Sequence, residues 1–267
     1  MKPEHIAEMK ARARNIVLLV AYDGTAYHGF QRQTPPVTAV QNVLEEKLQL
    51  VFGDSIELAA AGRTDAGVHA YGQVVNFFTN GTIPTSRIVR AVNSLLPPDI
   101  VVKAAAETDA DFSARHSATS KVYLYRMQQG ETPDPLRARY VWHERRPLDF
   151  CRMRQALDCI RGTHDFSAFR ASGGAPMSPV RTMYEAVLYE RPDHLLEFRI
   201  HGNGFLYHMV RNLVGTIADV GLGRLSPEEF QQILASRDRQ NASATAPARG
   251  LYLYEVHYAG RELFSFP

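Results

Sequence analysis

The feature that most constrains the fold is a run of small residues, 60–70, between two segments typical of β-strands. The predicted strands are residues 56–59 before the run and 73–78 after it. A sheet that contains both strands would hold the run as a tight, rigid loop. Loops held by a rigid scaffold often carry chemistry. The plainer alternative is an ordinary hairpin loop in which an acidic side chain caps a turn.

The loop carries one carboxylate, Asp65, and a cation two residues before it, Arg63. Gly62 and Gly67 flank this pair and permit turn conformations that residues with a Cβ resist. A carboxylate near a guanidinium stays ionised, which suits a nucleophile better than a proton donor. No second carboxylate lies nearby in the sequence, as a glycosidase pair or a magnesium site would require. Asp65 is therefore a candidate nucleophile, and an aspartate-dependent hydrolase is disfavoured.

Composition limits the cellular setting. The chain has 267 residues, 45% of them hydrophobic, which is enough for a well-buried core. Its two cysteines, Cys151 and Cys159, form no Cys-x-x-Cys motif, so neither a zinc site nor a disulfide framework is predicted. No segment approaches the roughly 20 apolar residues that span a bilayer. These patterns predict no membrane partner and favour a cytoplasmic protein.

Arginine dominates the basic residues. The net charge is only +2, but five of the 30 basic residues are lysines and the rest are arginines, whose planar guanidinium suits phosphate binding and base stacking. Residues 115–154 contain nine basic side chains against four acidic ones. A basic segment on a nearly neutral chain is typical of a protein that binds a polyanion. Genomic base composition could produce the same excess of arginine.

Hydrophobic periodicity predicts a mixture of strands and helices. Strands are expected at 15–22, 56–59, 73–78, 100–106, 121–127, 180–190, 195–202 and 251–256. Helices are expected at 37–52, 86–96, 149–161, 205–221 and 227–236, the first capped by Thr38 and ended by Gly53. The order is too irregular for a wound parallel sheet. The sequence predicts an α+β protein of two similar halves, 15–111 and 112–267, with mostly antiparallel sheets and helices.

Several motifs then point to one family. Residues 62–70, Gly-Arg-Thr-Asp-Ala-Gly-Val-His-Ala, resemble the signature of the TruA-type tRNA pseudouridine synthases. Further segments resemble family motifs in family order, and they are residues 29–33, 111–115, 121–125, 204–212 and 246–251. The resemblance covers essentially the whole chain from about residue 15. It departs at Tyr71, where smaller or different residues are common, and in the first fourteen residues.

The resemblance implies a cofactor-free isomerase with a central cleft between its two α+β halves, working as a homodimer. Its implied reaction converts uridine to pseudouridine at positions 38, 39 and 40 of the tRNA anticodon stem-loop, without a metal. By the same resemblance, Asp65 matches the catalytic aspartate. Tyr123 matches the tyrosine that lies against the target base. Arg211 matches the arginine that pairs with the aspartate, and Arg63 is a second cation beside it.

The sequence leaves alternatives to these roles. Without its flanking motif, Tyr123 would be interpreted as an aromatic residue of a strand that packs in the core. Arg211 would likewise be interpreted as a solvated residue of a helix. A non-catalytic RNA-binding protein of the same ancestry could use the same basic surface without turnover, although it would have no need of Asp65. Whether the aspartate attacks the ribose or the base also stays open.

Overall fold

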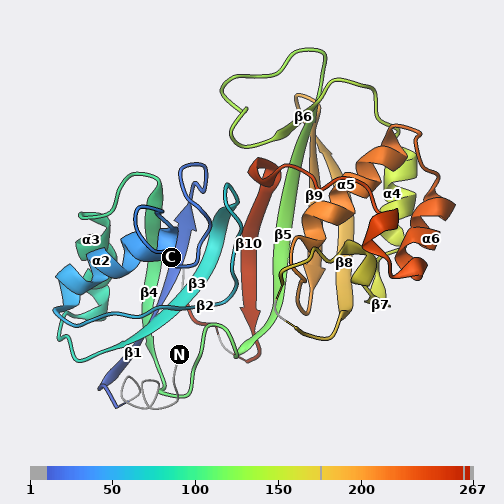
Figure 1. Cartoon of the computed structure of the whole chain (residues 1–267). Coiled ribbons are helices and arrows are strands. Elements are labelled where there is room, and N and C mark those ends of the chain that lie inside the picture. The colour runs from blue at the N-terminus through green and yellow to red at the C-terminus, as the bar shows by residue number, and fades with distance from the viewer. Residues whose placement is uncertain (1–10, 175, 261, 265–267) are drawn as a thin grey trace. The chain divides into compact units, whose positions relative to one another are not determined.

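The computed structural model describes residues 11–174, 176–260 and 262–264. These residues form ten β-strands, five α-helices and three short 3-10 helices, so the prediction of an α+β chain is confirmed. The chain divides into two compact units, shown in Figure 1. Unit 1 contains the residues up to Thr119 and those from Leu253 onward, and unit 2 runs from Ser120 to Tyr252. The predicted division after residue 111 stays a prediction.

Unit 1 is built on an antiparallel sheet. Its strands are β1 (Arg14–Tyr22), β2 (Ala59–Ala60), β3 (His69–Thr79), β4 (Ile100–Thr108) and most of β10 (Leu251–Tyr258). Strand β1 lies between β4 and β3 and is antiparallel to both, and β10 follows β3 in the sheet. Ile16, Val17 and Leu18 have no exposed surface, because both faces of β1 are covered. The predicted strand at 56–59 is reduced to β2, two residues that pair with β3.

Helices α2 (Val40–Phe52) and α3 (Thr85–Asn93) lie next to each other in unit 1, with α3 against β4 (Figure 1). Gly53 ends α2 at φ 74°, as the sequence predicts. The predicted cap by Thr38 is wrong. The first amides of the helix instead donate to backbone carbonyls, Val40 N to Gly29 O at 3.2 Å and Gln41 N to Phe30 O at 2.9 Å. No side-chain cap is needed, and the helix start is fixed to the segment before it.

The sheet strands of unit 2 follow the order β5-β9-β8-β7. The strands are β5 (Ala118–Gln129), β6 (Trp142–Glu144), β7 (Gly162–Asp165), β8 (Val180–Arg191) and β9 (Leu195–Gly202). Neighbours along this order pair antiparallel, and the short β6 pairs parallel with β5. The sequence did not predict β6 or β7, since both are too short to show a period. The predominance of antiparallel pairing is confirmed.

Helices α4 (Phe150–Asp158), α5 (Met209–Gly221) and α6 (Pro227–Ser236) pack together in unit 2 (Figure 1). The 3-10 helices η1 (Ser167–Phe169), η2 (Arg239–Asn241) and η3 (Ala248–Gly250) belong to the same unit. Helix α5 is the most buried, which explains its nearly continuous apolar sequence. It begins at Met209 and not at the predicted Phe205, because His208 has a left-handed backbone, φ 57°. Because of this turn, α5 begins directly after residues 204–208.

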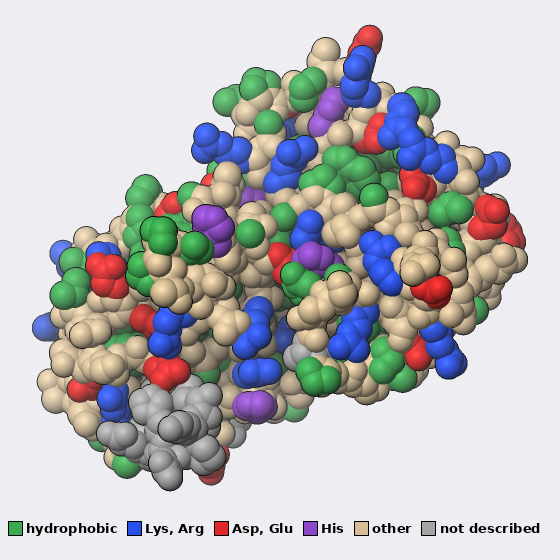
Figure 2. Space-filling view, viewed as in Figure 1, with side chains coloured by type: hydrophobic (Ala, Val, Ile, Leu, Met, Phe, Trp, Pro, Cys, Tyr) green, Lys and Arg blue, Asp and Glu red, His purple; other side chains and the backbone are tan. Residues whose placement is uncertain are grey.

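The basic segment at 115–154 is more neutral than its sequence indicates. At least five of its nine cations form ion pairs, and they are Arg126, Arg137, Arg146, Arg152 and Arg154. Figure 2 shows Lys and Arg side chains spread over the visible face, several of them beside Asp or Glu side chains. Because these ion pairs neutralise much of its positive charge, this segment alone would bind a polyanion only weakly. No helix among the described residues is long and apolar enough to cross a membrane.

Candidate active site

The loop that carries Asp65 joins β2 to β3 and is fixed at both ends. At its start, Ala61 N donates to Val74 O at 2.8 Å, and the buried Gln73 donates through Nε2 to Gly62 O at 2.7 Å. At its end, the Nδ1 of buried His69 accepts the amide of Gly24 at 3.1 Å. The loop is thus held by the sheet and by the segment that follows β1.

That segment, residues 23–30, also supports the middle of the loop. Phe30 N donates to Thr64 O at 3.0 Å, and Gly67 N donates to Tyr27 O at 3.3 Å. The side chain of Thr64 is buried and shares a 2.8 Å hydrogen bond with the hydroxyl of Tyr22. Burial raises the pKa of this tyrosine, so it stays neutral. Thr64 therefore anchors the loop immediately before Asp65.

Two glycines allow this close approach. A Cβ on Gly24 would lie 2.0 Å from Val68 O, and a Cβ on Gly29 would lie 2.7 Å from Thr64 O and 3.3 Å from Ala66 N. Gly29 also has φ +87°, a left-handed conformation that disfavours L side chains. The family-like motif at 29–33 therefore has a physical role: it provides the backbone surface on which the Asp65 loop rests.

We expect Gly29→Ala to lower turnover more than stability. The left-handed φ costs about 1–2 kcal/mol, and the new methyl group must also displace the Thr64 carbonyl and with it Asp65. Gly53→Ala is the matched control, because Gly53 has φ +74° with no atom within 4 Å of its Cβ position. Thermal unfolding should show at least as large a loss for Gly29→Ala as for Gly53→Ala, since only the former meets the Thr64 carbonyl, while initial rates should fall on the order of tenfold more in Gly29→Ala. Equal rates would show that the loop tolerates the displacement.

Asp65 is half-buried at the apex of the loop, between exposed neighbours Arg63 and Ala66 and next to buried Thr64. Its backbone carbonyl accepts the amide of Val68 at 3.1 Å, which closes a turn. The turn is made by the main chain, so it does not require the carboxylate as an acceptor. This weakens the interpretation of Asp65 as a simple turn cap.

Tyr123 lies on β5 in unit 2, paired with Ile200 of β9. Its side chain is 8% exposed, and its ring meets Phe205 edge to face, with centroids 4.8 Å apart and planes at 76°. Phe205 belongs to the segment just before α5. The ring is thus oriented by an aromatic contact, with a small accessible surface. Burial alone would fit a core residue equally well, so the proposed contact with a base still depends on the family motif.

Arg211 lies in the first turn of α5 and is half-buried, not a solvated helix residue. Its Nε donates to Ala246 O at 2.8 Å, and its own carbonyl accepts the amide of Ala246 at 3.1 Å. Arg211 therefore binds Ala246, in the 246–251 motif, through both its side chain and its main chain. This double contact limits the rotamers of the guanidinium.

The motif at 246–251 is held to both α5 and β5. Asn212 has no exposed surface, donates to Phe169 O at 2.8 Å and accepts from the Thr245 hydroxyl at 2.6 Å. Tyr125 donates to Pro247 O at 2.8 Å, and a Cβ on Gly250 would lie 2.6 Å from its ring. Burial raises the pKa of Tyr125, although the nearby charges of Arg211 and Arg249 oppose the shift. Asn212 is not among the predicted site residues, and the signal that marks it in the sequence is a polar residue inside a mostly apolar helix.

The four predicted residues thus fall into two pairs. Asp65 and Arg63 share one loop of unit 1, and Tyr123 and Arg211 belong to unit 2, where β5, α5 and the 246–251 motif meet. Among the described residues, no group of three or more His, Cys, Asp or Glu side chains is arranged to hold a metal ion.

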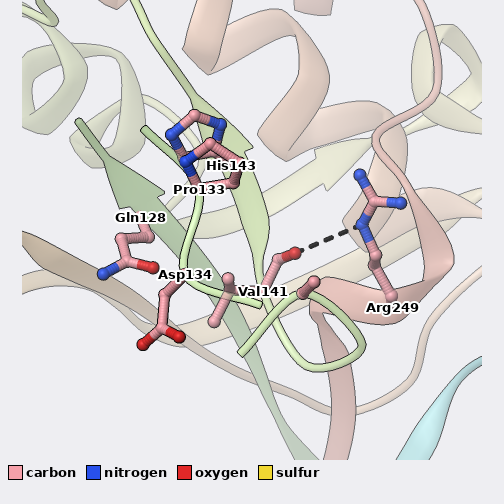
Figure 3. A pocket seen from close by; sticks show the side chains of 7 residues that line it. Gln128, Pro133, Asp134, Val141, His143 and Arg249 are labelled. Carbon is pink, nitrogen blue, oxygen red and sulfur yellow. Dashed lines mark hydrogen bonds between the residues drawn. The ribbon is translucent and has the colours of Figure 1, made fainter. Parts of the chain in front are cut away.

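Unit 2 also contains a cavity of about 290 Å³, drawn in Figure 3. Gln128 and Asp134 lie on one side of it and Arg249 on the other, where Arg249 Nε donates to Val141 O at 3.2 Å. None of the four predicted site residues lines this cavity. Its position gives no reason to revise the predicted residues.

A comparison with known protein families identifies the family to which the chain belongs. A family model described as tRNA pseudouridine synthase matches residues 18–117 and 156–259, ranges that include Asp65 and Arg211 and both supporting segments. The chain belongs to the tRNA pseudouridine synthase family. It is an isomerase that acts on tRNA, and the resemblance seen in its sequence is confirmed.

Relatives named tRNA pseudouridine synthase A are similar to this synthase over nearly its full length. The one from Acetivibrio thermocellus is 46% identical over 245 residues, which is 92% of this chain and 100% of the relative. The relative from Thermoanaerobacter sp. is 45% identical with the same coverage, and that from Lacticaseibacillus casei is 46% identical over 90% of this chain and 97% of its own. A solved archaeal box H/ACA sRNP Nop10-Cbf5 complex is similar with a TM-score of 0.35 at 14% identity, covering 74% of this chain and 44% of that chain, which is too low to support an inference.

Proposed function

We propose that this synthase isomerises uridines 38, 39 and 40 of the tRNA anticodon stem-loop, with Asp65 as the nucleophile. The observation that carries the proposal is the half-buried carboxylate of Asp65 at the apex of a loop fixed by Gln73, Thr64 and the 23–30 segment. A nucleophile has to be held still relative to the atom that it attacks. The family resemblance supports the choice of the anticodon arm.

The reaction moves one bond and one proton. The glycosidic bond between the ribose C1′ and N1 of uracil breaks, the base turns, and a bond from C1′ to C5 forms. The C5 proton is lost and N1 gains a proton, so substrate and product have the same atoms. Asp65 supplies the carboxylate that bonds transiently to the ribose or to the base, and both routes return it unchanged.

The other residues have distinct proposed roles. Tyr123 holds the detached uracil against its ring, as aromatic side chains hold bases taken out of a stack. Its contact with Phe205 keeps the ring from rotating. Arg211, held by its bond to Ala246 O, is by the family resemblance the cation that pairs with the catalytic aspartate. The exposed Arg63 is a second cation for the RNA beside the target nucleotide. No cofactor is proposed.

The test is to incubate the purified protein with an unmodified tRNA transcript and to map pseudouridine by position. We expect product confined to positions 38, 39 and 40. Product at uridines outside the anticodon arm would contradict the proposed site while leaving the family activity intact. Binding without product on any tRNA would favour the non-catalytic RNA-binding alternative.

We also propose that the enzyme works as a cytoplasmic homodimer. The family resemblance supports the dimer, and the two free thiols, Cys151 and Cys159, fit a reducing compartment. Sedimentation at micromolar concentration should give about twice the 29.9 kDa mass of the chain. A single species near the mass of one chain would contradict the dimer.

A further inference from the structure

Arg181, on β8, is a cation with only neutral partners. Its Nη1 donates to Ser178 O at 2.7 Å and to Val180 O at 2.6 Å, and its Nη2 lies 3.0 Å from the Met177 sulfur. Within the described part of the chain it forms no ion pair. The side chain is half-buried, so water screens its charge only in part.

Other arginines of unit 2 differ in this respect. Arg154 pairs with Glu190 at 2.6 Å, and Arg224 pairs with Asp219 at 2.8 Å. The charged neighbour of Arg181 is instead another cation, Arg170, whose Nη1 donates to Met177 O at 3.4 Å. Partial burial and the charge of Arg170 both lower the pKa of the Arg181 guanidinium. Two like charges brought together in this way are stabilised by a bound anion.

An exposed aromatic side chain lies beside this pair. Tyr207 is 42% exposed, and its ring lies against that of His208, with centroids 4.0 Å apart. A Cβ on Gly174 would lie 2.9 Å from the Cβ of Tyr207 and 3.9 Å from Nε of Arg170, so these two side chains are neighbours. A Cβ on Gly204 would lie 3.2 Å from Nε of Arg181. Because these positions are glycines, the Tyr207 and Arg181 side chains can pack closely on the backbone there.

We propose that Arg181 and Arg170 bind a backbone phosphate of the tRNA substrate and that Tyr207 stacks on an adjacent base. The guanidinium fork matches the geometry of phosphate oxygens, and the phenol ring offers a stacking face that accepts any base. The polyanion that this family modifies is tRNA, so a phosphodiester is the anion that the pair meets. The inference rests on tRNA as the substrate and adds a contact outside the four predicted site residues.

The test compares Arg181→Gln with Arg154→Gln, a control that removes the same charge where Glu190 already neutralises it. The affinity for an unmodified tRNA transcript is measured from about 50 to 300 mM salt. We expect the log-log salt slope to become shallower by about 0.7 in Arg181→Gln, the value for one lost phosphate contact, and to stay unchanged in the control. The KM for tRNA at 100 mM salt should rise on the order of tenfold, with kcat within about twofold.

Further variants separate phosphate binding from support of the Met177–Val180 turn. Arg181→Lys keeps the charge but loses the fork, so the salt slope should be retained even if thermal stability falls. Tyr207→Ala should weaken binding at an unchanged salt slope, because stacking releases no counterions. If Arg181→Gln unfolds below the assay temperature, Arg170→Gln provides the test, with the same expected loss of slope.

Wild-type slope and KM in folded Arg181→Gln and Arg170→Gln would overturn the phosphate site. Position mapping with the wild-type enzyme is scored separately. If the wild type makes pseudouridine in the anticodon arm while these variants bind normally, the phosphate site alone is refuted. If the wild type makes no product there, the proposed function fails, whatever the salt slopes are.

Discussion

Asp65→Asn is expected to abolish pseudouridine formation, with a residual rate on the order of 10⁻⁴ of wild type or less, because an amide cannot act as the nucleophile. Binding of tRNA should stay within about tenfold, or ~1.4 kcal/mol, since asparagine keeps the size of the side chain. Binding could tighten, because one negative charge near phosphate is removed. Single-turnover product mapping and filter binding on the same preparations measure the two quantities.

This variant also separates catalysis from a structural role of Asp65. The turn at residues 65–68 is closed by the backbone carbonyl, and asparagine is at least as good a turn residue as aspartate. If Asp65 only capped the turn, the Asp65→Asn variant would stay nearly fully active. Asp158→Asn, an exposed carboxylate on α4 that pairs with Arg161, is the control and should match wild type. Turnover of Asp65→Asn above a trace would refute the nucleophile even if the enzyme makes pseudouridine.

Most elements could be predicted from the sequence because their periodicity is strong. The buried run of β1 and the apolar face of α2 show the pattern expected of a strand and a helix, and Gly53 ends α2 where its left-handed φ is needed. The errors lie at element starts and in the short strands β6 and β7, which were not predicted. Helix α5 begins four residues later than predicted, because His208 adopts a left-handed turn that no local propensity of histidine indicates.

The site was predictable to a lesser extent. The motif around Asp65 could be read directly, but its support could not, because contacts such as Phe30 N to Thr64 O join residues far apart in sequence. The electrostatics of the basic segment were also hidden. Arg137 pairs with Asp193, 56 positions away, so a local count of charges overstated the free positive charge. Arg181, outside that segment, is the cation that the count missed.

Arg211→Lys is expected to lower kcat by about 100-fold, or ~2.7 kcal/mol, while the protein stays folded. The guanidinium of Arg211 donates to Ala246 O through Nε. In its proposed role Arg211 also pairs with the catalytic carboxylate, and a lysine ammonium, which is a single point of donation, cannot make both contacts in a fixed geometry. The backbone bond from Ala246 N to Arg211 O does not depend on the side chain, so the 246–251 motif should stay in place.

Arg224→Lys is the matched control, because Arg224 lies just beyond the other end of α5 and pairs with Asp219 on the surface. It should turn over like wild type, with Tm unchanged to within about 1 °C. Rates at saturating tRNA and thermal unfolding of both variants are the measurements. If Arg211→Lys lost several degrees of Tm together with its activity, Arg211 would be mainly a strut for the 246–251 motif. A rate within about threefold of wild type would show that charge alone suffices and that the fixed fork is not required.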